Sequence, residues 1–144
     1  MVATYYGDST NNFVTTGYDY MYGGDGDDRL TADPAGFDYI DGGRGYDYVY
    51  FSQNGTSYGT IFGGDGNDVA IGGNLGDNIY GGTGNDWVAG VGSSTPSAGN
   101  DYTPTSSNSD GADYLDGGQG TDGVYGFNGN DILYGGDGDD REQG

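Results

Sequence analysis

The aspartates of this chain combine a residue type and a spacing that could do chemistry. Six copies of the pattern Gly-Gly-X-Gly-X-Asp place a carboxylate at a fixed distance after three glycines. The carboxylates are Asp28, Asp47, Asp68, Asp86, Asp122 and Asp140. The glycines are Gly23, Gly24 and Gly26; Gly42, Gly43 and Gly45; Gly63, Gly64 and Gly66; Gly81, Gly82 and Gly84; Gly117, Gly118 and Gly120; and Gly135, Gly136 and Gly138. Recurring carboxylates can transfer protons or bind a metal ion.

The composition favours metal binding over catalysis. The chain has no histidine, cysteine or lysine, so its serines have no base partner, and we expect neither catalytic residues nor enzyme activity. Its 22 aspartates, one glutamate and three arginines give a net charge of −20. Aspartate is the shorter carboxylate, which suits turns and tight cages of oxygen ligands.

The same composition excludes several classes of partner. No basic patch is available for nucleic acid, and anionic membranes would repel the chain. No apolar run approaches the roughly 20 residues of a membrane span. The N-terminal residues MVATYYGDST lack the charged and apolar regions of a signal peptide, so we expect no cleaved leader here.

A step of 18 residues organises the repeats. The six copies start 19, 21, 18, 36 and 18 residues apart, and a weaker copy lies midway between most neighbours. The weaker copies end at Asp19, Asp38, Asp77 and Asp131, whereas the copy NGTSYG ends at Gly59 without a carboxylate. Strong and weak loops are therefore expected to alternate along one domain, residues 1–144.

The single gap of 36 residues suggests an insertion. Without the Ser/Thr/Pro-rich segment 93–110, the flanks join as Gly-Val-Gly-Gly-Ala-Asp, which is a weak copy ending at Asp113. The alternative is a complete extra coil, with Asn100 and Asp101 in its loops. The segment has loop composition and no strand pattern, which favours the insertion.

Between loops, one apolar residue stands between two outward ones, which predicts three-residue strands. Two strands per 18 residues predict an all-β, right-handed parallel β-roll: two parallel sheets with glycine loops along both edges. The inward positions are Leu30, Val49, Ala70, Val88 and Val124 after strong loops, and Met21, Ile40, Ile61, Ile79, Leu115 and Leu133 after weak loops.

In such a roll, the aspartates of one edge form a column. Parallel strands lie about 4.8 Å apart, where neighbouring unit charges repel by about 0.9 kcal/mol in water and about 3.5 kcal/mol at an effective dielectric near 20. A hard divalent cation between loops would reverse this repulsion. Ca²⁺ suits carboxylate and carbonyl oxygens in irregular geometry, whereas Zn²⁺ and copper prefer ligands that the chain lacks.

The six motifs in register, over residues 14–141, resemble the RTX (repeats-in-toxin), or hemolysin-type, calcium-binding repeat. The resemblance implies a β-roll that is exported by type I secretion, disordered without calcium and folded with it outside the cell. It also implies that each ion lies between neighbouring loops, held by sixth-position carboxylates and loop carbonyls. No other cofactor is implied.

Carried onto this chain, the resemblance gives about eight ions. Five lie on the strong edge, between Asp28 and Asp47, Asp47 and Asp68, Asp68 and Asp86, Asp86 and Asp122, and Asp122 and Asp140. Three lie on the weak edge, between Asp19 and Asp38, Asp77 and Asp113, and Asp113 and Asp131. Two positions beside Gly59 are expected to be empty or poorly held. The third-position carboxylates Asp25, Asp65 and Asp137 are expected to be solvated.

Aromatic residues at outward positions suggest a second function. Tyr22, Phe62, Tyr80 and Tyr134 share one sheet face with Asp41 and Asp116, and Tyr20, Tyr39 and Tyr114 stand nearby. Cross-strand stacking is one explanation. The other is a surface that binds carbohydrate, a parent-protein domain or a second copy. Ice binding is disfavoured, since these positions are bulky aromatics.

The C-terminal residues depart from the pattern. Glu142 occupies an inward position, where a carboxylate is expected to be buried without a partner, and residues 141–144 are expected to fray.

Overall fold

The computed structural model describes residues 2–15, 17–52, 56–90 and 111–144, which form fourteen strands in two parallel sheets of seven. The odd-strand sheet contains β1 (Thr4–Tyr6), β3 (Tyr20–Asp25), β5 (Ala35–Arg44), β7 (Thr56–Asp65), β9 (Asn78–Thr83), β11 (Tyr114–Gln119) and β13 (Ile132–Asp137). The even-strand sheet contains β2 (Phe13–Thr15), β4 (Arg29–Thr31), β6 (Tyr48–Tyr50), β8 (Val69–Ile71), β10 (Trp87–Ala89), β12 (Gly123–Tyr125) and β14 (Arg141–Gln143).

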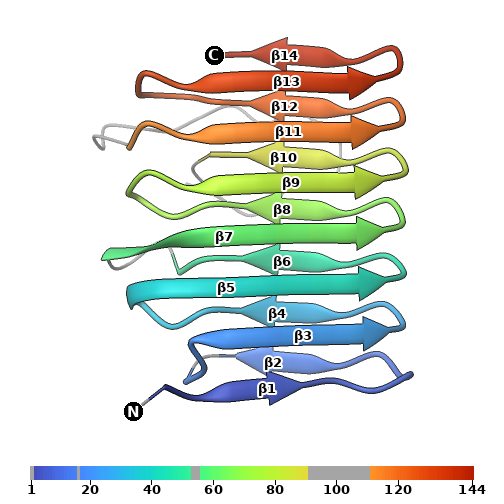
Figure 1. Ribbon diagram of the computed structural model, residues 1–144, viewed down its shortest axis with the longest axis vertical. Helices are drawn as coiled ribbons and strands as arrows, with labels where there is room; N and C mark the ends of the chain where they lie inside the picture. Colours follow the sequence, from blue (N-terminus) through green and yellow to red (C-terminus); the bar gives the residue numbers. More distant parts are fainter. Residues whose placement is uncertain (1, 16, 53–55, 91–110) are drawn as a thin grey trace.

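One odd strand and the following even strand make one coil, and the coils stack along the long axis (Figure 1). The loops that lead from odd to even strands lie along one edge, at the right in Figure 1, and contain the six intact motifs; we call this the strong edge. The return loops lie along the opposite weak edge. The predicted parallel β-roll is thus confirmed.

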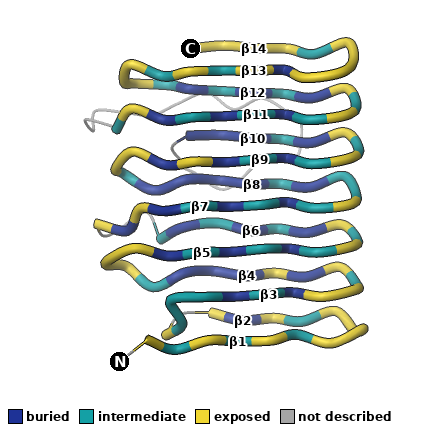
Figure 2. The backbone as a smooth tube through the Cα atoms, in the orientation of Figure 1, coloured by how far each residue is buried: buried dark blue, intermediate teal, exposed yellow. Residues whose placement is uncertain are grey.

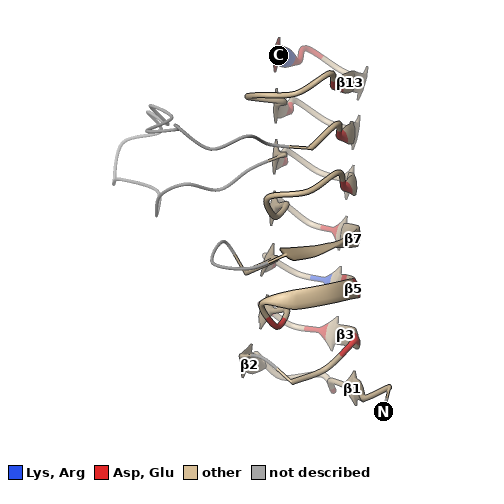
Figure 3. Cartoon of the chain, turned by 90° about the vertical axis from the view of Figure 1, so that its left-hand side faces the viewer, with Lys and Arg blue, Asp and Glu red and all other residues tan. Residues whose placement is uncertain are grey.

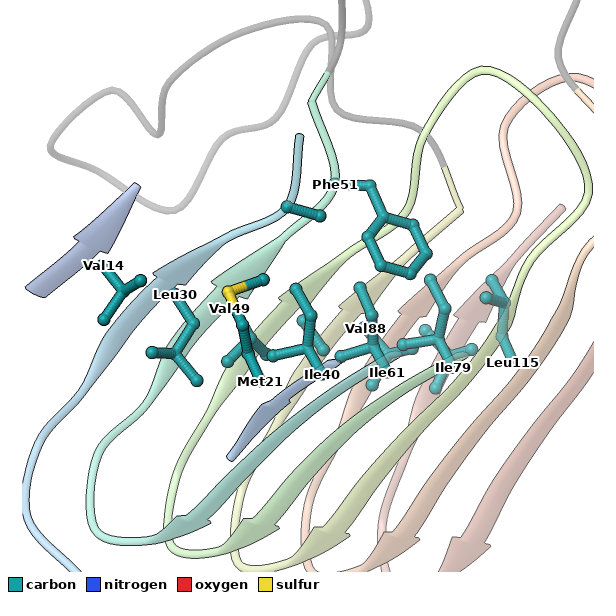
Figure 4. Packing of buried hydrophobic residues seen from close by; sticks show 13 residues of the cluster. Val14, Met21, Leu30, Ile40, Val49, Phe51, Ile61, Ile79, Val88 and Leu115 are labelled. Carbon is teal, nitrogen blue, oxygen red and sulfur yellow. The ribbon is translucent and has the colours of Figure 1, made fainter. Parts of the chain in front are cut away.

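The core is a double row of small and medium side chains between the two sheets (Figure 4). Ten of the predicted inward residues are 0% exposed, and Leu133 packs against them partly buried. Figure 2 shows this burial along the strands and exposure at the loops and at both ends of the stack. Each coil therefore contributes one inward residue per strand.

Six of the seven odd strands are longer than the predicted three residues, and β1 has three. The longer strands continue into the strong loops, because the second and third loop positions also pair between coils, as Gly24 pairs with Gly43 and Asp25 with Arg44. The even strands have three residues, as expected. The start of each strong loop is consequently held in register by the odd-strand sheet.

The two ends of the stack differ from the sequence predictions. Val14, predicted to begin a weak loop, lies in β2 opposite Leu30, and β1 pairs with β3. A further coil therefore precedes the first intact motif. At the other end, β14 pairs with β12. The predicted burial of Glu142 is wrong: its side chain is exposed because β14 is the last strand of its sheet.

The predicted insertion, 93–110, lies outside the described residues. On either side of it, β9 pairs directly with β11, so that Asn78 lies opposite Tyr114, and β10 pairs with β12. No described coil separates these strands. The described residues include no helix with the length and hydropathy needed to cross a membrane.

Candidate metal centre

The sixth-position aspartates form a continuous column along the strong edge. Asp28, Asp47, Asp68, Asp86 and Asp122 are only 2–5% exposed. The backbone N–H of each donates to Oδ1 of the aspartate in the next coil, over 2.7–2.9 Å, as far as Asp140. The hydrogen bonds fix the side-chain orientation, so one oxygen of each carboxylate is always directed to the preceding coil.

The second oxygen is buried and accepts no hydrogen bond from the described residues. This holds for Oδ2 of Asp28, Asp47, Asp68, Asp86 and Asp122. A Cβ built on Gly42 would lie 2.6 Å from Oδ2 of Asp47 and 2.4 Å from the carbonyl oxygen of Gly63. Carboxylate and carbonyl oxygens thus converge beside the first glycine of each motif. A buried charged oxygen without a partner is costly, and a cation would relieve it.

Electrostatics support the same conclusion. Burial, reinforced by the charges of Asp86 and Asp47, raises the pKa of Asp68 to about 7, although the hydrogen bond from the backbone of Asp47 lowers it. Burial likewise raises the pKa of Asp47 and of Asp86 to about 6, although each accepts a backbone hydrogen bond that lowers it. Burial also raises the pKa of Asp28 and Asp122. Burial therefore makes these aspartates of the column bind protons more tightly than exposed aspartates do.

Glycine is required at the loop positions for two reasons. Gly43 and Gly45 have φ of 107° and 135°, which side chains resist. A Cβ on Gly45 would also lie 2.1 Å from the carbonyl oxygen of Gly26 in the preceding coil. The same close contact recurs at the fourth position of each later motif. The loops therefore stack with their carbonyl groups against the next backbone.

The weak edge carries a second, shorter column. Asp38, Asp77 and Asp113 are 1–2% exposed. Oδ1 of Asp77 accepts a hydrogen bond from the N–H of Gly59 (2.9 Å). In the same way, Oδ1 of Asp113 accepts from the N–H of Asp77 (2.8 Å), and Oδ1 of Asp131 accepts from the N–H of Asp113 (3.0 Å). Burial, reinforced by the charges of Asp33, Asp19 and Asp77, raises the pKa of Asp38 to about 7. Its Oδ2 has no partner among the described residues.

Gly59 interrupts this weak-edge column, as the sequence indicates. The structure adds that Phe51, 0% exposed, occupies the row that Gly72 and Gly90 occupy in later coils. In those coils a Cβ at this row would meet the aspartate, at 2.6 Å from Oδ2 of Asp77 for Gly72. Ala32 stands in the same row, also 0% exposed, and its coil keeps the buried Asp38, so a methyl group there is compatible with the carboxylate. Phe51 places a much larger side chain in this row, in the coil that lacks the carboxylate.

Two polar features of the strong edge were not predicted. Residues 7–12 form a further strong loop, with Asn12 in the sixth position, which the motif search missed because it has one glycine. In addition, fifth-position side chains form an outer ladder: the N–H of Thr121 donates to Oδ1 of Asn85, and that of Asn85 to Asn67. The recurrence of Asn and Asp at the fifth position of the motifs could have indicated this ladder.

The third-position side chains lie outside the column. Asp25, Asp65 and Asp137 are exposed, as predicted. Arg44 lies 3.7 Å from Asp25 and 3.6 Å from Asp65. Exposed ion pairs of this kind contribute little stability. The arginine therefore neutralises the loop surface and leaves the buried aspartates unpaired.

The outward aromatic residues stack along the odd-strand sheet. The rings of Tyr6 and Tyr22 are nearly parallel and stacked, with centroids 5.3 Å apart, and those of Phe62 and Tyr80 are stacked at 4.8 Å. Tyr39 and Tyr114 link these pairs to their neighbours by tilted contacts. In the parallel pairs, the ring faces are turned toward one another, and this stacking joins adjacent coils.

The donor set fits a hard cation held between loops. No three side chains of Asp, Glu, His or Cys converge within the described ranges, so each inter-loop position offers at most two carboxylates and must be completed by carbonyl oxygens. Figure 3 shows acidic segments recurring along the stack. Oxygen ligands from carboxylates and carbonyls are those that Ca²⁺ prefers, and the unpartnered Oδ2 atoms are available to it.

Comparison with known protein families gives one match, to the RTX calcium-binding nonapeptide repeat, at residues 6–34, 35–53, 60–74, 71–90 and 107–142. Comparisons with curated proteins and with solved structures find no match. The first matched segment includes the coil that the motif search missed. The matched segments cover most of the chain and follow the coils of the two sheets, and the chain belongs to the RTX calcium-binding nonapeptide repeat family.

Proposed function

We propose that this calcium-binding β-roll folds when about eight Ca²⁺ ions bind between its loops, five on the strong edge and three on the weak edge. The observation that carries the proposal is the buried strong-edge column, in which each Oδ2 lacks a partner among the described residues. The aspartates would supply the charge and the glycine carbonyls the remaining ligands. The ion would supply the positive charge that the chain lacks.

The energy of binding is large enough to drive folding. When free Ca²⁺ exceeds the dissociation constant tenfold, each site adds about 1.4 kcal/mol of stability. Eight such sites add about 11 kcal/mol, which is within the range for the whole stability of a domain. Without the ions, the buried carboxylates oppose folding, and the high glycine content increases the entropy lost on folding.

This coupling suits an exported protein. RTX repeats are typical of secreted proteins. A chain that stays unfolded at low calcium could pass through a type I secretion channel, and the calcium outside the cell would then fold it. We therefore place the module outside the cell or on its surface, in a structural role without catalysis.

Circular dichroism with calorimetry tests the proposal. We expect a disordered spectrum in chelator, a cooperative gain of β structure with Ca²⁺, and about eight ions per chain. Mg²⁺ at the same concentration should not replace Ca²⁺, because it requires a tighter octahedron. A chain with the same β spectrum in chelator and in calcium would contradict calcium-driven folding.

The aromatic stacking supports a scaffold rather than an adhesive surface. The parallel ring pairs direct one face of each ring at its partner, so these faces are not open to a ligand. Replacing Tyr22, Tyr80 and Tyr134 by serine should consequently lower stability, by about 0.2–1 kcal/mol for each lost cross-strand pair. An adhesin would instead lose a carbohydrate or protein partner at unchanged stability.

A further inference from the structure

We propose that the first strong loop, residues 7–12, is a metal-independent cap that closes the N-terminal end of the strong-edge column. The inference rests on the proposed function, because it states where calcium is not used. In this proposal, Asn12, Thr10 and Asp8 join the first coil to the next, which is the role of an ion between the later loops.

The loop is in register with the calcium-type loops. The backbone N–H of Asn12 donates to Oδ1 of Asp28 over 2.6 Å, just as each aspartate donates to the next one. The N–H of Arg29 donates to the carbonyl of Asn12 (2.8 Å), and that of Asp25 donates to the carbonyl of Asp8 (3.0 Å). Asn12 therefore holds the sixth position of a complete coil, which continues the column by one step.

The side chain of Asn12 is satisfied by its own coil. Its Oδ1 accepts from the hydroxyl of Tyr5, and its Nδ2 donates to the carbonyl oxygen of Thr10. The N–H and the hydroxyl of Thr10 both donate to Oδ1 of Asp8, over 2.9 Å and 2.5 Å. In contrast to the buried aspartates, the amide oxygen of Asn12 already has a partner and is not left for an ion.

The backbone of the loop also differs. Gly24 and Gly26, at the second and fourth positions of the next loop, have φ of 106° and 116°. Asp8 and Thr10 hold these positions in the first loop, and Phe127 is the only non-glycine residue with positive φ in the described part of the chain. The first loop thus has no left-handed residue at these positions, although the carbonyl oxygen of Asp8 still lies against Gly24 of the next loop, 2.4 Å from a Cβ placed there.

A neutral amide removes one charge from the end of the column. Asn12 joins this loop to the loop of Asp28 through backbone hydrogen bonds, and its neutral side chain needs no ion there. Calcium binding on the strong edge then begins between Asp28 and Asp47.

Ion counting on the full chain tests the cap, with Asn12→Ala, Asp68→Asn and wild type compared by calorimetry and by equilibrium dialysis with ⁴⁵Ca²⁺. Asn12→Ala should bind as many ions as wild type and need a higher calcium concentration to fold. Asp68→Asn should lose ions.

If Asn12→Ala binds one ion fewer while Asp68→Asn loses ions, the cap is overturned and calcium binding stands. If neither variant loses an ion, the proposed function itself fails.

A gain of function provides the second arm. The triple substitution Asp8→Gly, Thr10→Gly and Asn12→Asp restores the motif in the first loop and should bind one ion more than wild type. If the triple variant folds with calcium yet gains no ion, these three side chains are not what keeps calcium out of the first loop, and the proposal is overturned.

Discussion

A strong-edge aspartate uses its two carboxylate oxygens differently. Oδ1 of Asp68 accepts the backbone N–H of Asp47, whereas Oδ2 is buried without a partner in the described structure. An asparagine could keep the first interaction, since its amide oxygen accepts a hydrogen bond equally well. It could not supply the negative charge. The charge and the hydrogen bond can therefore be separated by one isosteric substitution.

Asp68→Asn should weaken the two inter-loop positions that share Asp68. If free Ca²⁺ is tenfold above the dissociation constant, the loss is about 3 kcal/mol of stability. Urea unfolding in saturating calcium measures it. Asp65→Asn is the matched control, because Asp65 is exposed and its ion pair with Arg44 contributes at most about 1 kcal/mol. Equal losses in the two variants would contradict the role of the sixth position.

At the scale of a loop, the pair Phe51 and Gly59 marks a break in the weak-edge column of carboxylates. The phenyl ring is fully buried in the row that is glycine in later coils, and the carboxylate opposite is missing. The bulky ring and the missing carboxylate occur in the same coil, whereas the coil of Asp38 has only the methyl group of Ala32 in this row. The weak-edge column is consequently divided into two parts.

Reversing both changes should join the two parts. Phe51→Gly with Gly59→Asp should add up to two Ca²⁺ ions, counted by calorimetry. Phe51→Ala alone should destabilise the calcium-bound roll by about 3–5 kcal/mol, because it leaves a cavity, without changing the ion count. A double variant that folds but gains no ion would show that other features of this loop exclude calcium.

The close stacking of the loops makes a second prediction at this scale. Gly45→Ala introduces both a strained φ and a Cβ 2.1 Å from the carbonyl oxygen of Gly26. Gly36→Ala introduces only the strain, since its φ is 108° and no atom lies within 4 Å of the Cβ position. We expect a loss of about 1–2 kcal/mol for Gly36 and about 1–3 kcal/mol more for Gly45. Thermal unfolding of both variants measures the two losses of stability. Equal losses would show that the contact between loops is unimportant.

Across the whole molecule, the buried carboxylates couple stability to pH. Without calcium, the pKa values of Asp38 and Asp68 are about 7 and those of Asp47 and Asp86 about 6, above the ordinary value of 3.8. Between pH 4 and 7 the folded chain therefore binds more protons than the unfolded chain. Its stability must fall as the pH rises through this range.

The metal-free chain should accordingly be more ordered at pH 5 than at pH 8. Circular dichroism in calcium-depleted buffer over this range measures the change. In the presence of calcium the direction reverses, because protons compete with the ion for the same oxygens and the apparent affinity should fall below about pH 7. A metal-free chain that gained structure as the pH rose would contradict the burial of these aspartates.

The repeat made much of this architecture predictable. The recurring motifs and the apolar residue after each loop indicate which residues point inward and which aspartates share an edge, and the structure places Ile61 and Asp68 accordingly, although each follows its equivalent in the preceding coil by 21 residues. The loop at residues 7–12 was missed because its offset is 16 residues and it has glycine only at its first position. The burial of Phe51 could not be predicted either, since it lies outside the weak copy NGTSYG that ends at Gly59.

Direct pairing of each coil with its immediate neighbours has an evolutionary consequence. Because β9 meets β11 and β10 meets β12 across the longest interval of the chain, whole units can be gained or lost while the remaining junctions persist. Duplication of one coil in the gene would lengthen the stack and add the calcium sites of that coil. Selection can thus change the length of the stack and the number of calcium ions that it binds together, one coil at a time.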